Sequence, residues 1–291
     1  MDASQERVFH YHADANALGG VLTHPYKTVI TTAANSSLSN AGGHNSSPTV
    51  PFHLDHVLRC KAAYTHTAGG EEGEGQDGNW ASLTTAVVED VNLLEVVTAD
   101  KVVAQIATKH PKIGNVPSVS FVGTQFVNLR INGEIVEPVL DLHPFPAPQQ
   151  PKKGPATGKS SAASRLAEIR QFSPYHHSDV RKLAKKQSSK LVGPSHDPDI
   201  LKRRYGWLAS DDEIDSRGHL LCSLVTEYRK GDSKNTYGHV IHVPGFGNVF
   251  LAEVTFDHRS YQLTMIRAEM GCASSGTVGI AAARTNGTTV P

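Results

Sequence analysis

Three residues near the N-terminus carry metal-binding side chains at a spacing that one face of a β-strand would bring together. They are His10, His12 and Asp14, each two positions from the next. Because successive side chains of a strand point to opposite faces, these two imidazoles and one carboxylate would share a face. Such a set suits Fe(II), Mn(II) or Zn(II). With 16 histidines in the chain, pairs at this spacing also arise by chance, so a plain exposed strand face is the alternative.

A second group of such side chains follows in the segment Phe52-His53-Leu54-Asp55-His56. On a strand His53 and Asp55 would share one face, and His53 or His56 could complete the first set. The resulting hypothesis is a metal-dependent enzyme with a His/Asp site in a β domain. A divalent transition metal is the one cofactor that the sequence suggests, and the sequence requires none.

Nucleophilic catalysis finds little support in the sequence. Cys60, Cys222 and Cys272 are far apart and form no CxxC pair, so we expect free, mostly buried thiols rather than disulfides or a zinc knuckle. The chain also lacks GxSxG, the motif that presents the catalytic serine of α/β-hydrolases. The sequence therefore leaves open whether the protein is an enzyme.

Positive charge is concentrated in one part of the chain. The 291 residues balance 28 Lys and Arg with 28 Asp and Glu, whereas residues 151–204 hold 13 Lys and Arg against 4 Asp and Glu. The remaining chain is therefore acidic by the same amount. The predicted partner-binding residues are Arg181, Lys182, Lys185, Lys186, Lys190, Lys202, Arg203 and Arg204.

This basic block has three interpretations. It could dock on an acidic surface, either of a partner protein or of a neighbouring subunit in a homo-oligomer. It could bind the phosphates of nucleic acid, with Tyr175, Tyr205 and Trp207 available to stack on bases. It could also be no more than a solvated helical face.

The elements that must position these residues are mainly strands. Segments rich in Val, Ile, Thr and Leu, such as residues 82–91 and 101–107, are interrupted about every ten residues, as is typical of an all-β sandwich or barrel. Residues 126–139 predict a hairpin, because Asn132-Gly133 tolerates the two positive φ angles of a type I′ turn. Further strands are predicted at 219–228, 261–270 and 277–284. Residues 36–47 and 68–79 are predicted to be exposed loops, and residues 285–291 a tail.

The segment HVIHVPGFGNVFLAEV, residues 239–254, contains a glycine-rich turn beside two histidines. A phosphate-binding P-loop would need Lys-Ser or Lys-Thr and then a helix, and an apolar strand follows here instead. His239 and His242 are three positions apart, so on a strand they would face opposite sides and could not chelate one ion. We therefore predict a structural β-hairpin with no phosphate or metal site.

The amino-acid composition changes at residue 143. Residues 143–161 are rich in proline and predict a linker. Helices are expected at 164–172, from Ser178 through 183–191, and at 200–207 after the start signal Asp197-Pro198. The predicted organisation is an N-terminal part of a β domain at 1–146, a linker with a basic helical insert at 147–215, and the C-terminal part of the β domain at 216–291.

Four segments, in chain order, resemble the bacterial choice-of-anchor P proteins and similar uncharacterised bacterial proteins. They are TAVVEDVNLLEVVTADKVVAQI, SFVGTQFVNLRINGEIVEP, HVIHVPGFGNVFLAEV and YQLTMIRAEM. The resemblance covers about half of the chain, rests on strands and turns, and implies a β-rich fold and no particular activity. Members of that group are usually exported surface proteins, and the basic insert is a departure from them.

The sequence thus predicts a mainly β protein, an antiparallel sandwich or barrel with a basic α-helical insertion. Its leading functional hypothesis is a non-enzymatic binding or self-assembling protein. The metal-dependent enzyme is the alternative, and nucleic-acid binding through the insert is a weaker one. With no signal peptide and no segment long enough to span a bilayer, the chain as given is expected in the cytoplasm, or outside the cell if a leader was removed.

Overall fold

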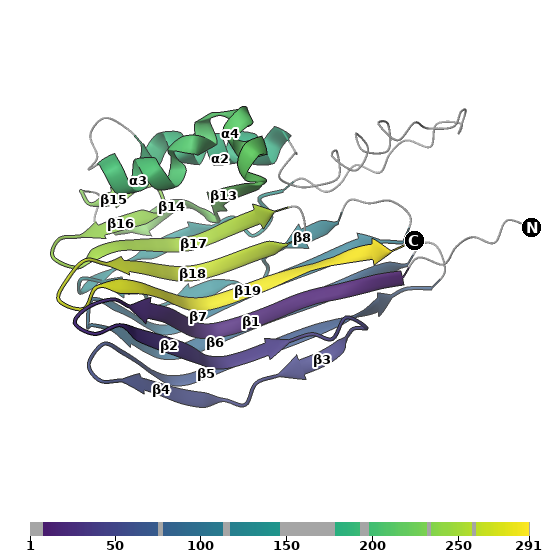
Figure 1. Cartoon of the computed structure of the whole chain (residues 1–291), viewed down its shortest axis with the longest axis horizontal. Coiled ribbons are helices and arrows are strands. Elements are labelled where there is room, and N and C mark those ends of the chain that lie inside the picture. The colour runs from purple at the N-terminus through teal and green to yellow at the C-terminus, as the bar shows by residue number, and fades with distance from the viewer. Residues whose placement is uncertain are drawn as a thin grey trace, which may run out of the picture.

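Two antiparallel β-sheets stack face to face, and a group of helices covers one end of the stack (Figure 1). The computed structural model describes residues 8–74, 78–112, 117–145, 178–192, 198–231, 234–257 and 260–290. The predicted helix at 164–172 and most of the predicted linker lie outside these residues.

The first sheet, called sheet A, contains the first two strands and most of the C-terminal ones. Its strands run in the order β15-β16-β17-β18-β19-β1-β2, and β13 also pairs with β17. The strands are β1 (Val8–Leu22), β2 (Thr28–Ser37), β13 (His219–Ser223), β15 (Thr236–Tyr237), β16 (Val240–Val243), β17 (Gly247–Asp257), β18 (Tyr261–Met270) and β19 (Gly276–Val290).

The second sheet, called sheet B, comes from the segment between β2 and the insert. Its order is β11-β10-β7-β6-β5-β3, with β4 beside β5 and both β8 and β9 beside β7. The strands are β3 (Gly43–Ser46), β4 (Val50–Leu54), β5 (Leu58–Glu72), β6 (Asn79–Leu93), β7 (Val97–Pro111), β8 (Ser118–Ser120), β9 (Gln125–Val127), β10 (Arg130–Ile131) and β11 (Glu134–Ile135).

The helices of the insert pack on β13, and a small separate sheet flanks the insert in the chain. The small sheet pairs β12 (Glu137–Leu140) with β14 (Val225–Lys230). The helices are α2 (Ser178–Leu191), α3 (Pro198–Tyr205), η3 (Gly206–Ala209) and α4 (Asp211–Arg217), and they sit over β13 and the neighbouring strands (Figure 1). The helices predicted from Ser178 and near residues 200–207 are confirmed.

Alternating side chains explain why the long strands form a sandwich. Along β5 and the first part of β1, buried and exposed positions alternate, so each strand gives one face to the core and one to solvent. Buried residues of both sheets and of the insert belong to one hydrophobic cluster. The prediction of a mainly β sandwich with a helical insertion is confirmed.

Two predicted hairpins are also present. Arg130 and Ile131 pair with Ile135 and Glu134, and the turn between them has φ of 53° at Asn132 and 80° at Gly133. Both angles are positive, as the type I′ turn requires. The segment at 239–254 is the β16–β17 hairpin, which turns a corner in sheet A as expected.

Four predictions about individual segments differ from the structure. The expected loop at 36–47 contains strand β3, and the one at 68–79 contains the end of β5. This end of β5 pairs with β3 as far as Gly69 and with β6 as far as Glu72. The expected tail at 285–291 continues β19, whose residues through Val290 pair with β1. The single strand expected at 219–228 is two strands, β13 and β14, which pair with different sheets. Pairing across the sheet supplies order that the polar and glycine-rich composition did not indicate.

No helix among the described residues is long and apolar enough to cross a membrane.

Candidate functional site

A buried carboxylate lies where the helical insert meets sheet A. Glu253, in the middle of β17, is only 4% exposed. Burying an ionised carboxylate without partners would cost much free energy. The residues that contact Glu253 therefore decide its protonation state and its role.

Two arginines neutralise Glu253. Arg204, at the end of α3, donates from Nε to Oε1 at 3.2 Å and from Nη2 to Oε2 at 2.9 Å. Arg267, on the neighbouring strand β18, donates from Nε to Oε2 at 2.7 Å. One guanidinium thus comes from the insert and one from the sheet, so the carboxylate ties the insert to the β body.

A tyrosine and a histidine complete the cluster. The hydroxyl of Tyr205, a residue 1% exposed, donates to Glu253 and lies 3.0 Å from Nε2 of His239. His239 Nε2 is 3.6 Å from the Glu253 carboxylate. We call Arg204, Tyr205, His239, Glu253 and Arg267 the junction cluster.

An irregularity in β17 places the cluster on one face. Phe250 and Glu253 are three positions apart, and regular alternation would send them to opposite faces. Ala252, between them, has φ of 48°, which breaks the alternation. The side chains of Arg204 and Arg267 accordingly lie over the Phe250 ring, at 5.2 Å and 3.6 Å from its centre, while bonding to Glu253.

The charges in the cluster decide the protonation of Glu253. Burial acts to raise the pKa of its carboxyl, but the contact with His239 and the positive charges of Arg267 and Arg204 outweigh burial and hold that pKa well below its usual value. Burial, followed by the charge of Glu253, raises the pKa of the Tyr205 hydroxyl well above its usual value. The Glu253 carboxylate is therefore ionised and accepts the hydrogen bond, and the neutral Tyr205 hydroxyl donates it. These protonation states are those of a structural ion-pair cluster.

The eight predicted partner-binding residues divide into three groups. Arg204 belongs to the junction cluster. Arg181 and Lys185, on one stripe of α2, pair with acidic residues of α4. Arg181 bonds to Asp211 at 3.2 Å and also to Asp215, and Lys185 bonds to Asp211 at 2.7 Å. The other five are exposed: Lys182, Lys186, Lys190, Lys202 and Arg203.

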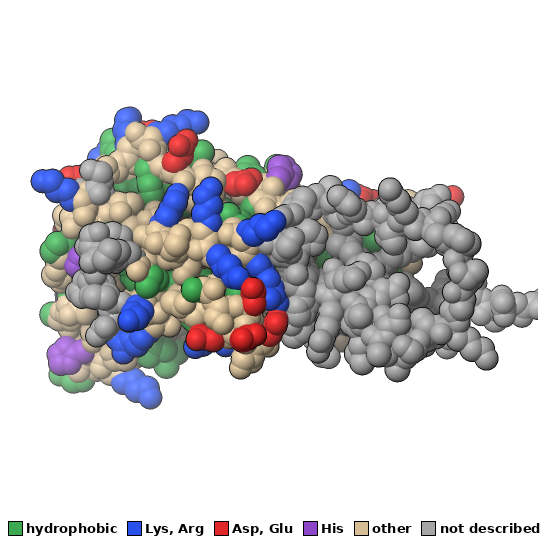
Figure 2. Space-filling model, turned by 90° about the horizontal axis from the view of Figure 1, so that it is seen from above, with side chains coloured by type: hydrophobic (Ala, Val, Ile, Leu, Met, Phe, Trp, Pro, Cys, Tyr) green, Lys and Arg blue, Asp and Glu red, His purple; other side chains and the backbone are tan. Residues whose placement is uncertain are grey.

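The exposed group forms a basic outer face on the insert. Lys182, Lys186 and Lys190 are four residues apart on α2, so they follow one stripe of the helix. Lys202 and Arg203 extend the positive charge onto α3. Figure 2 looks down on this side of the molecule and shows Lys and Arg side chains spread over it. We call these five residues the basic outer face.

The structure describes two aromatic residues of the insert, and both are buried, so neither offers an exposed ring on which a base could stack. Tyr205 is in the junction cluster, and Trp207 is 6% exposed, with Arg217 stacked over its ring at 4.8 Å. Tyr175 lies outside the described residues. Little of either the Tyr205 or the Trp207 ring is therefore accessible to a base.

The structure brings together only part of the predicted metal site. His10, His12 and Asp14 do share the solvent-facing side of β1, since Phe9, Tyr11 and Ala13 point into the core. Asp14, however, accepts a hydrogen bond from Arg284 Nε at 2.8 Å. His53 and His56 belong to sheet B, on β4 and in the turn after it, and His53 points to the outer side of that sheet.

The two groups thus lie on separate sheets whose outer faces point in opposite directions, so they cannot gather around one ion. In the parts of the chain that the structure describes, no three His, Cys, Asp or Glu side chains are arranged to hold a metal. The metal site gains no support from this arrangement.

The cysteines are as expected from the sequence. All three are free, and Cys60 and Cys222 are buried. Burial raises the pKa of both of these thiols, which keeps them in the unreactive protonated form.

Comparison with known proteins places the chain in a family. Residues 9–257 match the model of a family described as "Domain of unknown function (DUF8256)". The chain belongs to the DUF8256 family. No curated protein and no solved structure matches it. The resemblance to choice-of-anchor P proteins stays a prediction that these comparisons do not support.

The DUF8256 match includes the helical insert and most of the junction cluster. Arg204, Tyr205, His239 and Glu253 lie within residues 9–257, whereas Arg267 and all of β18 and β19 follow the matched segment. In this DUF8256 chain the later strands complete sheet A and supply one of the two arginines for Glu253.

Sequence reasoning missed Glu253, His239 and Arg267 as members of one cluster. Only a charged residue inside an otherwise apolar strand, the Glu in VFLAEV, signalled a special position. Its partners are distant in sequence, so no spacing pattern could reveal them.

Proposed function

We propose that this protein is a non-enzymatic binding protein whose helical insert presents the basic outer face to an acidic surface of a partner protein. The observation that carries the proposal is the exposure of five basic side chains on one side of the insert. Arg204, Arg181 and Lys185 pair with Glu253, Asp211 and Asp215 within the chain, and the side chains of Lys182, Lys186, Lys190, Lys202 and Arg203 are exposed to solvent.

Rigidity of the insert supports a binding role. Val180, Ala184 and Leu191 of α2 and Leu201 of α3 are buried in the same hydrophobic cluster as both sheets. Gln187 bonds to the backbone of Ser223 in both directions, at 2.8 Å to its carbonyl and 2.7 Å from its N–H. A charged face held on a fixed scaffold loses little conformational freedom when a partner binds.

An acidic protein surface fits better than nucleic acid. The buried Tyr205 and Trp207 leave this part of the insert without the stacking platforms that single-stranded nucleic acid uses. Electrostatic attraction between a basic face and an acidic one needs no such groups, and it weakens with added salt.

The proposal is tested with a labelled poly-glutamate peptide and a labelled oligo-dT, each titrated with the protein and followed by fluorescence anisotropy. The test variant is K182E/K186E/K190E. The matched control is K27E/R59E/R130E, which makes the same change of net charge at exposed positions away from the insert.

Poly-glutamate should bind the wild type at low salt, and the test variant should lose roughly tenfold or more in affinity while the control keeps most of it. Equal losses in both variants would show that only net charge matters. Tighter binding of oligo-dT than of poly-glutamate would favour the nucleic-acid alternative.

A neighbouring subunit could be the acidic partner, as the homo-oligomer hypothesis holds. Light scattering on a sizing column at low and high salt separates this case. A salt-sensitive oligomer in the wild type that K182E/K186E/K190E abolishes would identify a second copy of the chain as the partner. A monomer under all conditions would leave a different acidic protein.

A further inference from the structure

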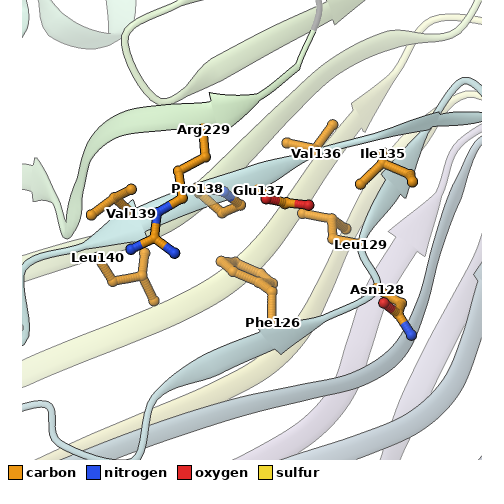
Figure 3. A pocket seen from close by; sticks show the side chains of 10 residues that line it. All are labelled: Phe126, Asn128, Leu129, Ile135, Val136, Glu137, Pro138, Val139, Leu140 and Arg229. Atoms are coloured by element: carbon orange, nitrogen blue, oxygen red, sulfur yellow. The ribbon is translucent and has the colours of Figure 1, made fainter.

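A hollow opens where the small sheet diverges from sheet B. It has a volume of about 430 Å³ and lies between the β9–β10–β11 segment on one side and β12 with β14 on the other (Figure 3). This size is within the range of pockets that bind small molecules. It is distinct from the basic outer face and from the junction cluster.

The path of the chain explains why the hollow exists. Val136 still bonds to the β10 side, donating its N–H to the carbonyl of Leu129 at 2.9 Å. From Glu137 onward the chain pairs with β14 instead. Pro138 has no N–H with which to continue a ladder. The two sheets therefore separate at this point, and a space remains between their side chains.

Most of the side chains that line the hollow are apolar, although polar atoms contribute more of its accessible surface than apolar atoms do. Phe126, Val139 and Leu140 line it and are only partly buried, and Ile135 is 41% exposed at its rim. A concave place lined by apolar side chains with a few polar groups among them is a feature of ligand sites.

A β-bulge places one exposed arginine, Arg229, at the lining of this hollow. Across β12 and β14, Glu137 lies opposite Lys230 and Pro138 lies opposite Tyr228, so Arg229 is the extra residue on its strand. Bulges of this kind re-aim a side chain. In Figure 3 the guanidinium of Arg229 extends over the hollow toward Leu140 and Phe126.

Arg229 is the unbalanced charge of the site. Glu137, the carboxylate on the wall, is paired with Lys230 at 2.8 Å, and the amide of Asn128 is bonded to Asp100 at 2.6 Å. Arg229 makes no hydrogen bond or ion pair within the part of the chain that the structure describes. A ligand that balances the charge of Arg229 would therefore be an anion.

We propose that this hollow binds a small carboxylate with an apolar body, such as a medium-chain fatty acid. The hydrocarbon lies against Phe126, Val139 and Leu140, and the carboxylate accepts hydrogen bonds from the Arg229 guanidinium. A guanidinium can meet both oxygens of a carboxylate at once, which makes this contact stronger than a neutral hydrogen bond.

Titration calorimetry with octanoate tests the proposal, with octanol and octylamine as probes of the same apolar length. Octanoate should bind, octanol should bind roughly tenfold more weakly because it lacks the charge, and octylamine should not bind. The variant R229Q should lose octanoate affinity by a similar factor. Its matched control is R59Q, an exposed arginine on β5.

Three results would overturn the proposal: no binding of octanoate to the wild type, equal binding of octanol and octanoate, or equal losses in R229Q and R59Q. Because Arg229 is exposed, R229Q is expected to fold, and its circular dichroism spectrum checks this. The outcome does not depend on the basic outer face, so the two proposals succeed or fail separately.

Discussion

The hydroxyl of Tyr205 donates a hydrogen bond to the carboxylate of Glu253 across the junction between the helical insert and sheet A, and both side chains are shielded from water. Arg204, the residue before Tyr205, bonds to the same carboxylate. Two consecutive residues of the insert are thus anchored on one residue of the sheet. The described part of the insert is therefore a built-in element of the fold and presents its basic outer face in a fixed orientation.

Replacing Glu253 by glutamine should destabilise the protein strongly. The amide carries no charge, so the partly exposed Arg204 would lose its carboxylate partner and Arg267 would keep only its ion pair with Glu269. Breaking such a buried network costs up to about 3–5 kcal/mol. The free energy of unfolding, measured with urea, should fall by this amount. E227Q, at an exposed position on β14, is the matched control and should change it by less than about 0.5 kcal/mol. Similar values for the two variants would contradict a stabilising role for the cluster.

The partly buried imidazole of His110 should make the protein less stable in mild acid. Burial lowers the pKa of this histidine from 6.5 to about 4. The folded state therefore stays unprotonated while the unfolded state gains a proton, so stability is complete above about pH 6.5 and is lost as the pH falls toward 4. The loss amounts to up to about 3 kcal/mol.

The variant H110L should flatten this part of the stability curve, followed as the free energy of unfolding from pH 7 down to pH 4. H44L, at an exposed histidine, is the control and should retain the wild-type slope. A curve for H110L as steep as that of the wild type would assign the acid sensitivity to other groups. The carboxyl of Glu253, with its lowered pKa, contributes stability that is lost only at still lower pH.

Two adjacent glycines of β5 should respond differently to alanine. A Cβ on Gly69 would lie 2.5 Å from Leu38 and 2.8 Å from the ring of Tyr11, whereas one on Gly70 would meet nothing within 4 Å. G69A should therefore destabilise the protein by about 1–3 kcal/mol, the usual cost of overpacking. G70A makes the same chemical change in open space and should be close to neutral. Thermal unfolding of the two variants gives the comparison, and equal midpoints would contradict close packing at Gly69.

Local signals in the sequence were enough for much of the fold. Asn132-Gly133 predicts its hairpin because the two residues tolerate positive φ without help from the rest of the chain. Ser178 and Asp197-Pro198 mark helix starts for a similar local reason. The alternation of apolar residues predicts strands wherever one face is buried.

The same local signals failed where pairing came from distant segments. Residues 68–72 and 285–290 look like a loop and a tail, but they are strands because β3, β6 and β1 provide partners for their backbone. Glycine is common in loops, yet Gly69 is needed in a strand because Tyr11 packs against it. The amino-acid composition of a segment reports only its own residues, whereas strand pairing depends on which other segments lie beside it in the folded chain.

By itself, the sequence determined that the chain is mainly β, where its basic helices begin, and which residues carry the positive charge. The pairing of Arg204 with Glu253 and of Lys185 with Asp211 appears only in the tertiary structure, because Glu253 lies some fifty residues from Arg204 along the chain and Asp211 is on another helix. The same holds for the placement of His10 and His53 on separate sheets and of Arg229 over a hollow lined mostly by apolar side chains. Local propensities act over a few residues, whereas burial and charge pairing depend on which surfaces the folded chain brings into contact.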